Sequence, residues 1–167
     1  MEFVRKYKIE NWDNAKEKLL LGIETMKGNY DCKFSSMSRS DYKERNIKPV
    51  YWETMIDIID VHLKDYVFSW KCSSYNIQSM WFAEYSHDGA DFDWHTHEGC
   101  NMSGVLQIVI DDKKTSTSLL GQSIELDEGD LILFPSMLPH KGPKVTKGQK
   151  IVIGFNWDIF GSLLHNH

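Results

Sequence analysis

After Tyr66, the apolar residues of this chain fall into short runs that turn-forming residues separate. The runs lie at residues 77–85, 104–110, 116–121, 123–126, 130–135 and 150–157. A surface helix would need a longer stretch with a period of 3.6 residues, and no such stripe occurs in this part of the sequence. Short strands at regular spacing, divided by turn residues, indicate an all-β sandwich or barrel. The C-terminal part of the chain is therefore restricted to a fold of packed short strands.

The N-terminal third has a helical periodicity instead. Apolar residues recur at intervals of four, four and three between Asn11 and about Lys27, and Asn11 or Asp13 is placed to cap that helix. A second apolar stripe predicts a helix within residues 50–66. The two stripes consist of Ala15, Leu19, Ile23 and Met26, and of Trp52, Met55, Ile56, Ile59 and Leu63.

The two patterns together predict an α+β fold, with the N-terminal helices packed against a sheet. No internal repeat or low-complexity linker divides the 167 residues, so we expect one domain over residues 1–167. Its helical part should cover about residues 1–70, and its β core should cover about residues 75–160.

The net charge restricts the possible binding partners, and the cysteines bear on the location of the protein. The net charge of −5 and the pI near 5.8 make nucleic acid an unlikely partner, because phosphate contacts need a basic face. No apolar segment is long enough to span a membrane. The cysteines Cys32, Cys72 and Cys100 are odd in number and lack CxxC spacing, so we expect free thiols and a cytoplasmic location.

Two histidines, His95 and His97, lie between two of the predicted strands in the stretch DFDWHTHEGC. Residues i and i+2 of an extended chain point to the same side, so both imidazoles can face one point. Other histidines, such as His62, have no partner at a useful spacing and are read as structural. The HxH pair by itself leaves a metal site and a structural role as equal alternatives.

His140 supplies a third imidazole. It follows the strongly apolar run 130–135, which Gly129 introduces and which Pro135 and Pro139 stiffen at its exit. A sheet folded into a jelly roll would bring this strand beside the HxH strand. Three imidazoles would then occupy one face of a metal and leave positions open for substrate and oxygen, as catalytic sites do.

The order of these features resembles the iron(II)- and 2-oxoglutarate-dependent oxygenases, and is closest to the small prolyl-hydroxylase-like members of phages and bacteria. The resemblance covers about residues 80–157: HxH, then SG and an apolar strand, EGDLILFP, LPH and a basic residue before a final strand. It implies a double-stranded β-helix (a jelly roll, cupin-like). The residues that fall into the family's positions are Tyr85, Gly89, Phe92, His95 and His140.

The resemblance also implies a metal centre and a cosubstrate site. Iron(II) would be held by His95, His97 and His140, and 2-oxoglutarate by Lys150 with help from Tyr85. The implied reaction is a hydroxylation in which 2-oxoglutarate becomes succinate and carbon dioxide. The resemblance allows three classes of substrate: a small molecule such as a free amino acid, a protein side chain or a modified nucleotide. The negative net charge of the protein disfavours nucleic acid. A homodimer is also open.

Two positions depart from the family's pattern. His97 stands where the family usually has a carboxylate, which leaves the metal more positive, and the neighbouring Glu98 should point to the opposite face of an extended strand. Lys150 stands where arginine is commoner, so a cation is kept but the bidentate fork is lost. Three aromatic residues would either shape a pocket wall or pack in the core: Trp81, Trp94 and Phe155.

The same stretch also resembles a cupin, which is the alternative function: a cupin-type metalloprotein without 2-oxoglutarate. GADFDWHTH and GDLILFPSMLPH match the two cupin patterns in part. The cupin glutamate beyond HxH is missing, because Asn101 and Met102 stand there, and Met137 replaces a glycine. Lys150 and the run from Tyr85 to Phe92 favour the oxygenase. A metal-free binding or structural protein is a third class.

Overall fold

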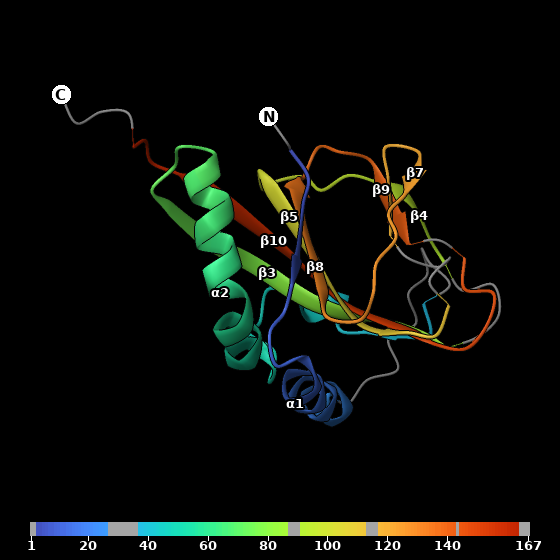
Figure 1. The fold of residues 1–167 in the computed structure, drawn as a ribbon. Coiled ribbons are helices and arrows are strands. Elements are labelled where there is room, and N and C mark those ends of the chain that lie inside the picture. Colours follow the sequence, from blue (N-terminus) through green and yellow to red (C-terminus); the bar gives the residue numbers. More distant parts are fainter. Residues whose placement is uncertain (1–2, 27–36, 87–90, 113–116, 143, 164–167) are drawn as a thin grey trace.

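The structure is a computed structural model that describes residues 3–26, 37–86, 91–112, 117–142 and 144–163 (Figure 1). In chain order its elements are β1 (Arg5–Lys8), α1 (Trp12–Thr25), β2 (Arg39–Ser40), the 3-10 helix η1 (Tyr42–Glu44), α2 (Trp52–Ser69), β3 (Ser74–Tyr85), β4 (Phe92–His95), β5 (Met102–Ile110), β6 (Ser118–Leu119), β7 (Gln122–Ser123), β8 (Asp130–Pro135), β9 (His140–Gly142) and β10 (Lys150–Phe160). The fold is rich in antiparallel strands and has two α-helices, which is the α+β class that the periodicity predicts.

The strands form two sheets. The larger sheet has the order β1-β8-β5-β10-β3-β2, and the smaller has the order β4-β9-β6-β7. Figure 1 shows α1 and α2 on one side of the larger sheet, with β4, β7 and β9 on the other side. Each predicted apolar run contains or overlaps one of these strands, and the run 130–135 coincides with β8.

The helix-facing side of the larger sheet carries the main core. Alternate residues of a strand point to opposite faces, so every second residue of β3, β5 and β10 meets the helices. The fully buried members of this core include Leu19, Ile23, Met55, Ile59 and Leu63 of the helices, and Met80, Phe82, Leu106, Ile153 and Phe155 of the strands. Burying each such side chain stabilises the fold by about 1.5–3 kcal/mol. The predicted helical stripes are therefore the faces that contact the sheet.

The opposite side of the larger sheet meets the smaller sheet. Ile132 and Phe134 of β8 pack there with Leu119 of β6 and with Leu126. A pocket also lies on this side, lined by residues of β3, β5 and β10 from the larger sheet and of β4 and β9 from the smaller one. The helices thus cover one face of the larger sheet, and the pocket lies on the other.

The N-terminal part contains a strand that the periodicity did not predict. β1 pairs with β8, placing Arg5 opposite Leu133 and Lys8 opposite Asp130. Its sequence, RKYK, offers only Tyr7 to the main core, and Lys6 and Lys8 lie 3.5 and 3.2 Å from the buried carboxylate of Asp130. Backbone pairing and this charge contact attach β1 to the sheet, and an apolar pattern cannot reveal either.

Asn11 occupies the predicted N-cap position of α1, but it has the left-handed φ of 50° and its side chain makes no capping hydrogen bond. Asp13 lies inside the first turn, where a carboxylate interacts favourably with the helix dipole.

The second helix and the last strand extend three residues beyond their predicted ends, to Ser69 and Phe160. Neither helix of the described ranges is both long and apolar enough to cross a membrane.

Candidate metal centre and cosubstrate pocket

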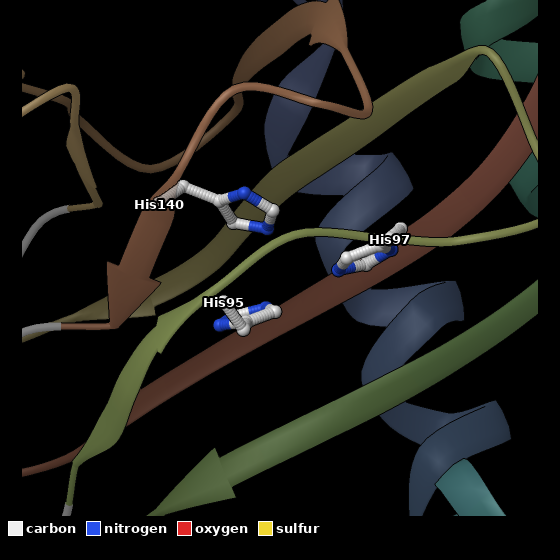
Figure 2. A group of neighbouring side chains, drawn as sticks. All are labelled: His95, His97 and His140. Carbon is white, nitrogen blue, oxygen red and sulfur yellow. The ribbon is translucent and has the colours of Figure 1, made fainter.

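Strands β4 and β9 of the smaller sheet bring three histidines together. His95, the last residue of β4, lies opposite His140, the first residue of β9, in their antiparallel register. His97 lies two residues beyond β4, and its backbone N–H donates to the carbonyl of Ser136 (3.1 Å). Figure 2 shows the three imidazoles turned toward one another, and one ring nitrogen of each lies within 4.8 Å of the others.

Each imidazole is oriented by a hydrogen bond from its Nδ1 atom. The acceptors are the Asp93 carbonyl for His95 (2.7 Å), the Leu138 carbonyl for His140 (3.0 Å) and Oδ1 of Asn156 for His97. Because these oxygens only accept, the proton lies on Nδ1 and the lone pair lies on Nε2. Metal-binding histidines are oriented in the same way. All three Nε2 atoms are therefore available as ligands.

Burial keeps these imidazoles neutral at pH 7. It lowers the pKa of His95 to about 4 and that of His140 to about 3, and a positive charge on His97 would lower both further, as would one on His95 for His140. The pKa of His97 is lowered by burial as well, and further by the positive charge of Arg45. Because a metal competes with protons for imidazole nitrogen, a neutral cluster is ready to bind a cation.

Aromatic side chains hold the rings of the cluster in place. Phe92 meets His95 edge-on, with ring centroids 4.2 Å apart, and Phe134 meets His140 at 4.8 Å. Trp81 lies 5.5 Å from His97. The imidazoles are therefore packed from the side as well as hydrogen-bonded.

The donor set is three nitrogens and no carboxylate. Glu98 lines the pocket, but the metal-sized cluster found among the described residues consists of the three histidines alone. Imidazole suits iron, zinc, copper and nickel, and three ligands leave positions open for other groups. The cluster fits a divalent transition metal with open coordination positions.

The pocket beside the histidines has a volume of about 370 Å³, which is sufficient for a small molecule. Alternate residues of β10 line it: Lys150, Val152, Gly154 and Asn156. Gly154 is required there, because a Cβ atom would lie 2.9 Å from Cζ2 of Trp81. The face of β10 that carries Lys150 is thus the same face that carries Asn156, the partner of His97.

Lys150 is only 1% exposed and lines the pocket beside Tyr85. Its Nζ atom lies 5.6 Å from the centroid of the Tyr85 ring. Burial lowers the pKa of Lys150 to about 7, because the ammonium form is poorly solvated. A carboxylate bound in this part of the pocket would favour the charged form.

The structure places the remaining predicted residues in different surroundings. Tyr85 and Trp81 line the pocket, as does Phe92. Trp94 is 41% exposed, with Nζ of Lys141 located 5.2 Å from its ring centroid, and Phe155 lies in the main core. Neither Trp94 nor Phe155 forms a pocket wall. Gly89 and Cys32 lie outside the described residues.

The pocket residues that the sequence analysis did not predict include Tyr42, Arg45 and Asn156. The signal for Asn156 was present in the sequence, because the two-residue period that brings Lys150 inward continues through Gly154 to Asn156. Tyr42 and Arg45 lie in a polar stretch without periodicity, so no local pattern placed them near the histidines.

No protein-family model matches this sequence, and a search of the curated proteins finds no match either. Solved structures do match its fold. The viral collagen prolyl hydroxylase of Paramecium bursaria Chlorella virus-1, solved with 2-oxoglutarate, is 17% identical and has a TM-score of 0.67, covering 93% of this chain and 95% of its own.

Two bacterial structures show the same similarity. HygX from Streptomyces hygroscopicus, solved with nickel and 2-oxoglutarate, is 11% identical with a TM-score of 0.69, covering 93% of this chain and 82% of its own. A prolyl-4-hydroxylase from Pseudomonas putida is 13% identical with a TM-score of 0.54, covering 92% and 91%. This chain therefore has the fold of the 2-oxoglutarate- and iron(II)-dependent oxygenases.

Proposed function

We propose that this protein is an iron(II)- and 2-oxoglutarate-dependent oxygenase of the hydroxylase type, built on a double-stranded β-helix. The observation that carries the proposal is that three neutral imidazoles and one buried lysine line a single pocket. The two antiparallel sheets support the double-stranded β-helix, and the oxygenases that share the fold support the reaction class.

His95, His97 and His140 hold iron(II) through their Nε2 atoms in this proposal. Iron(II) bound there together with 2-oxoglutarate would supply the oxidising chemistry of a hydroxylase. Because all three ligands are neutral, the ion keeps its full double charge, and this charge favours an anionic cosubstrate. The orienting oxygens of Asp93 and Leu138 keep the lone pairs of His95 and His140 directed at the ion.

Lys150 and Tyr85 bind the far carboxylate of 2-oxoglutarate. A lysine ammonium donates charge-assisted hydrogen bonds to a carboxylate, and these bonds are strongest where water is excluded. Lys150 is fully buried, and Ala83, Val105 and Val152 give this part of the pocket apolar walls. The walls therefore exclude water from the ammonium and the bound carboxylate.

The alternative, a cupin without 2-oxoglutarate, is less well supported. Cupins usually add a glutamate ligand beyond HxH, where Asn101 and Met102 stand in this chain. The side chain of Asn101 is engaged with the backbone of Ile159, donating to its carbonyl (3.0 Å) and accepting from its N–H (2.9 Å). Met102 is buried in the main core. Neither residue can serve as the fourth ligand.

The proposal specifies only the class of the substrate, which is a small molecule or a protein side chain. The net charge of −5 disfavours a polyanionic nucleic acid. Cys72 and Cys100 are free thiols, which supports a cytoplasmic location, and Cys32 lies outside the described residues. A homodimer remains part of the prediction.

Consumption of 2-oxoglutarate tests the function. Purified protein with iron(II), ascorbate and 2-oxoglutarate in air should release succinate, because the proposed reaction converts 2-oxoglutarate to succinate and carbon dioxide. His140→Ala should reduce both bound iron and succinate to background. The matched control is His62→Ala, since His62 packs against Tyr7 away from the pocket. Equal succinate from wild type and His140→Ala, or no binding of 2-oxoglutarate by iron-loaded wild type, would contradict the proposal.

A further inference from the structure

Besides Lys150, two cationic side chains line the pocket: Lys141, whose Nζ lies 5.2 Å from the ring centroid of the exposed Trp94, and Arg45. The backbone carbonyl of Arg45 accepts a hydrogen bond from the N–H of Met80 (3.4 Å), whereas Lys150 lies opposite Tyr85 in the register of β10 and β3. Met80 and Tyr85 are five residues apart on β3, which corresponds to roughly 17 Å along a strand. Arg45 and Lys150 therefore approach the histidines from different ends of the pocket.

Buried polar contacts fix the backbone segment that carries Arg45. Asp41 is 2% exposed and accepts hydrogen bonds from the N–H of Phe82 (2.7 Å) and from the hydroxyl of Tyr51 (2.7 Å). Ser40 is fully buried and donates its hydroxyl proton to the carbonyl of Phe82 (2.6 Å). A carboxylate is costly to bury unless donors surround it, so these contacts hold residues 40–45 firmly against β3.

The guanidinium of Arg45 is positioned by an aromatic stack. It lies over the Tyr42 ring, with Cζ 4.1 Å from the centroid, and Nη1 donates to the Tyr42 carbonyl (3.1 Å). Tyr42 meets Trp81 edge-on at 5.1 Å, and Trp81 in turn lies 5.5 Å from His97. These contacts connect the guanidinium of Arg45 to His97, a proposed metal ligand, through the two aromatic rings.

The charge of Arg45 is not neutralised by a carboxylate in the described part of the chain. The salt bridges found there include Arg39 with Glu84 (2.8 Å) but none that involves Arg45. The hydrogen bond to Tyr42 uses one guanidinium N–H, which leaves others for a second acceptor. A guanidinium with free donors matches a carboxylate or phosphate in two-point geometry.

We propose that Arg45 is the residue that selects the substrate, by binding an anionic group, a carboxylate or a phosphate ester, while Tyr42 and Trp81 contact the neutral part next to it. The substrate would then reach the histidines from the Arg45 end, while 2-oxoglutarate takes the Lys150 end. This inference rests on the proposed function, because it presupposes that the pocket holds a cosubstrate and a substrate together. It narrows the substrate to compounds with an anionic group.

Matched pairs of small probes test this inference without turnover. The protein is loaded with manganese(II) and saturating 2-oxoglutarate, and the paramagnetic broadening of probe NMR signals reports binding close to the metal. The probes are the N-acetyl-L-amino acids and their neutral amides. N-acetyl-O-phospho-L-serinamide and its unphosphorylated form make a further pair that separates phosphate from carboxylate.

At least one anionic probe should bind wild type at least tenfold more tightly than its neutral partner. Arg45→Gln should abolish that preference, and Arg45→Lys should retain a part of it. Lys48→Gln, which removes an exposed cation 4.0 Å from the carboxylate of Glu53, should keep the full preference. The inference is overturned if wild type prefers no anionic probe, or if Arg45→Gln keeps the tenfold preference.

The two proposals can fail separately. Binding of 2-oxoglutarate is measured in every variant, and Arg45→Gln should bind it as wild type does. If wild type does not bind 2-oxoglutarate, the proposed function fails, and the probe series with manganese(II) alone then decides whether Arg45 binds anions. A tenfold or greater loss of 2-oxoglutarate affinity in Arg45→Gln would instead assign Arg45 to the cosubstrate and overturn the inference.

Discussion

Among single residues, Asn156 has the most specific role that the geometry suggests. It lies on β10 of the larger sheet, yet its Oδ1 atom accepts the Nδ1 proton of His97, next to the smaller sheet. Removing the acceptor should free the His97 ring to rotate and to change tautomer, which typically lowers metal affinity about 10–100-fold. Asn156→Leu should therefore weaken manganese(II) binding in a titration by that factor, while Asn156→Asp should not.

An exposed asparagine provides the control for this prediction. Asn76→Leu, on β3, makes the same chemical change at a solvent-facing position and should bind manganese(II) as wild type does. A dissociation constant for Asn156→Leu equal to that of wild type would show that the contact with His97 does not orient the ring.

Lys150 gives a prediction about pH. Its pKa is lowered to about 7 by burial, so in the free protein the side chain is charged below pH 7 and increasingly neutral above it. If 2-oxoglutarate needs the ammonium form, binding above pH 7 must take up a proton, and the apparent Kd should rise about tenfold per pH unit there. Below pH 7 the Kd should be flat. Calorimetric titrations at several pH values with manganese(II) present measure this directly.

Replacing Lys150 by arginine tests whether this lysine causes the rise of the apparent Kd with pH. Arginine stays protonated at every pH used, so Lys150→Arg should bind 2-oxoglutarate with little dependence on pH. The assignment of Lys150 would be wrong if wild type and Lys150→Arg showed the same slope, or if wild type showed none above pH 7.

At the scale of the elements, β5 and β10 pack so closely that one position excludes any side chain. A Cβ atom at Gly104 would lie 2.1 Å from Cζ of Phe155, which faces the helices. Overpacking of this kind usually costs about 1–3 kcal/mol. Gly104→Ala should lower the free energy of unfolding in urea by that amount. In a Phe155→Leu background the same change should cost clearly less, since the two sites are coupled. Equal costs in the two backgrounds would contradict this packing.

The strands and the HxH pair could be predicted because the information is local, whereas His140 was placed beside the pair only through the expected jelly roll. The run 130–135 is apolar throughout and forms β8, and the spacing of His95 and His97 is enough to bring both rings to one side. Lys150 reaches the pocket through the same two-residue period. An aromatic residue carries no such directional signal, and so Trp81 lines the pocket while Phe155 lies in the core.

The segment that carries Arg45 could not be predicted, because its partners are distant in sequence. Asp41 is buried by contacts to Tyr51 and Phe82, which are 10 and 41 residues away. Residues 39–45 show no period that would signal those contacts. β1 was missed for the same reason, since its partner strand β8 lies more than a hundred residues further along the chain.

At the scale of the whole molecule, the site depends on both sheets being in place. β4 and β9 of the smaller sheet supply His95 and His140, and β10 of the larger sheet supplies Asn156 and Lys150. A metal that binds only this assembled state stabilises it, by about 2.7 kcal/mol when its free concentration is a hundred times Kd.

Chelator treatment should therefore lower the melting temperature by several degrees, and added manganese(II) should restore it. His140→Ala should melt at one temperature under both conditions, because it lacks one ligand. Differential scanning calorimetry with and without chelator gives the comparison. Identical melting curves for wild type in both conditions would indicate a protein that binds no metal.

The central claim is that one pocket binds iron(II) and 2-oxoglutarate together. The most direct measurement is an anaerobic titration of the protein with iron(II) and then with 2-oxoglutarate, following the weak visible charge-transfer band of the iron–2-oxoglutarate chelate. Wild type and Lys144→Ala, which changes an exposed lysine six residues before Lys150, should develop the band to saturation. Lys150→Ala and Lys150→Glu should bind iron equally well but need much more 2-oxoglutarate. A wild type that binds iron without developing the band, or a Lys150→Glu variant that saturates like wild type, would contradict the account.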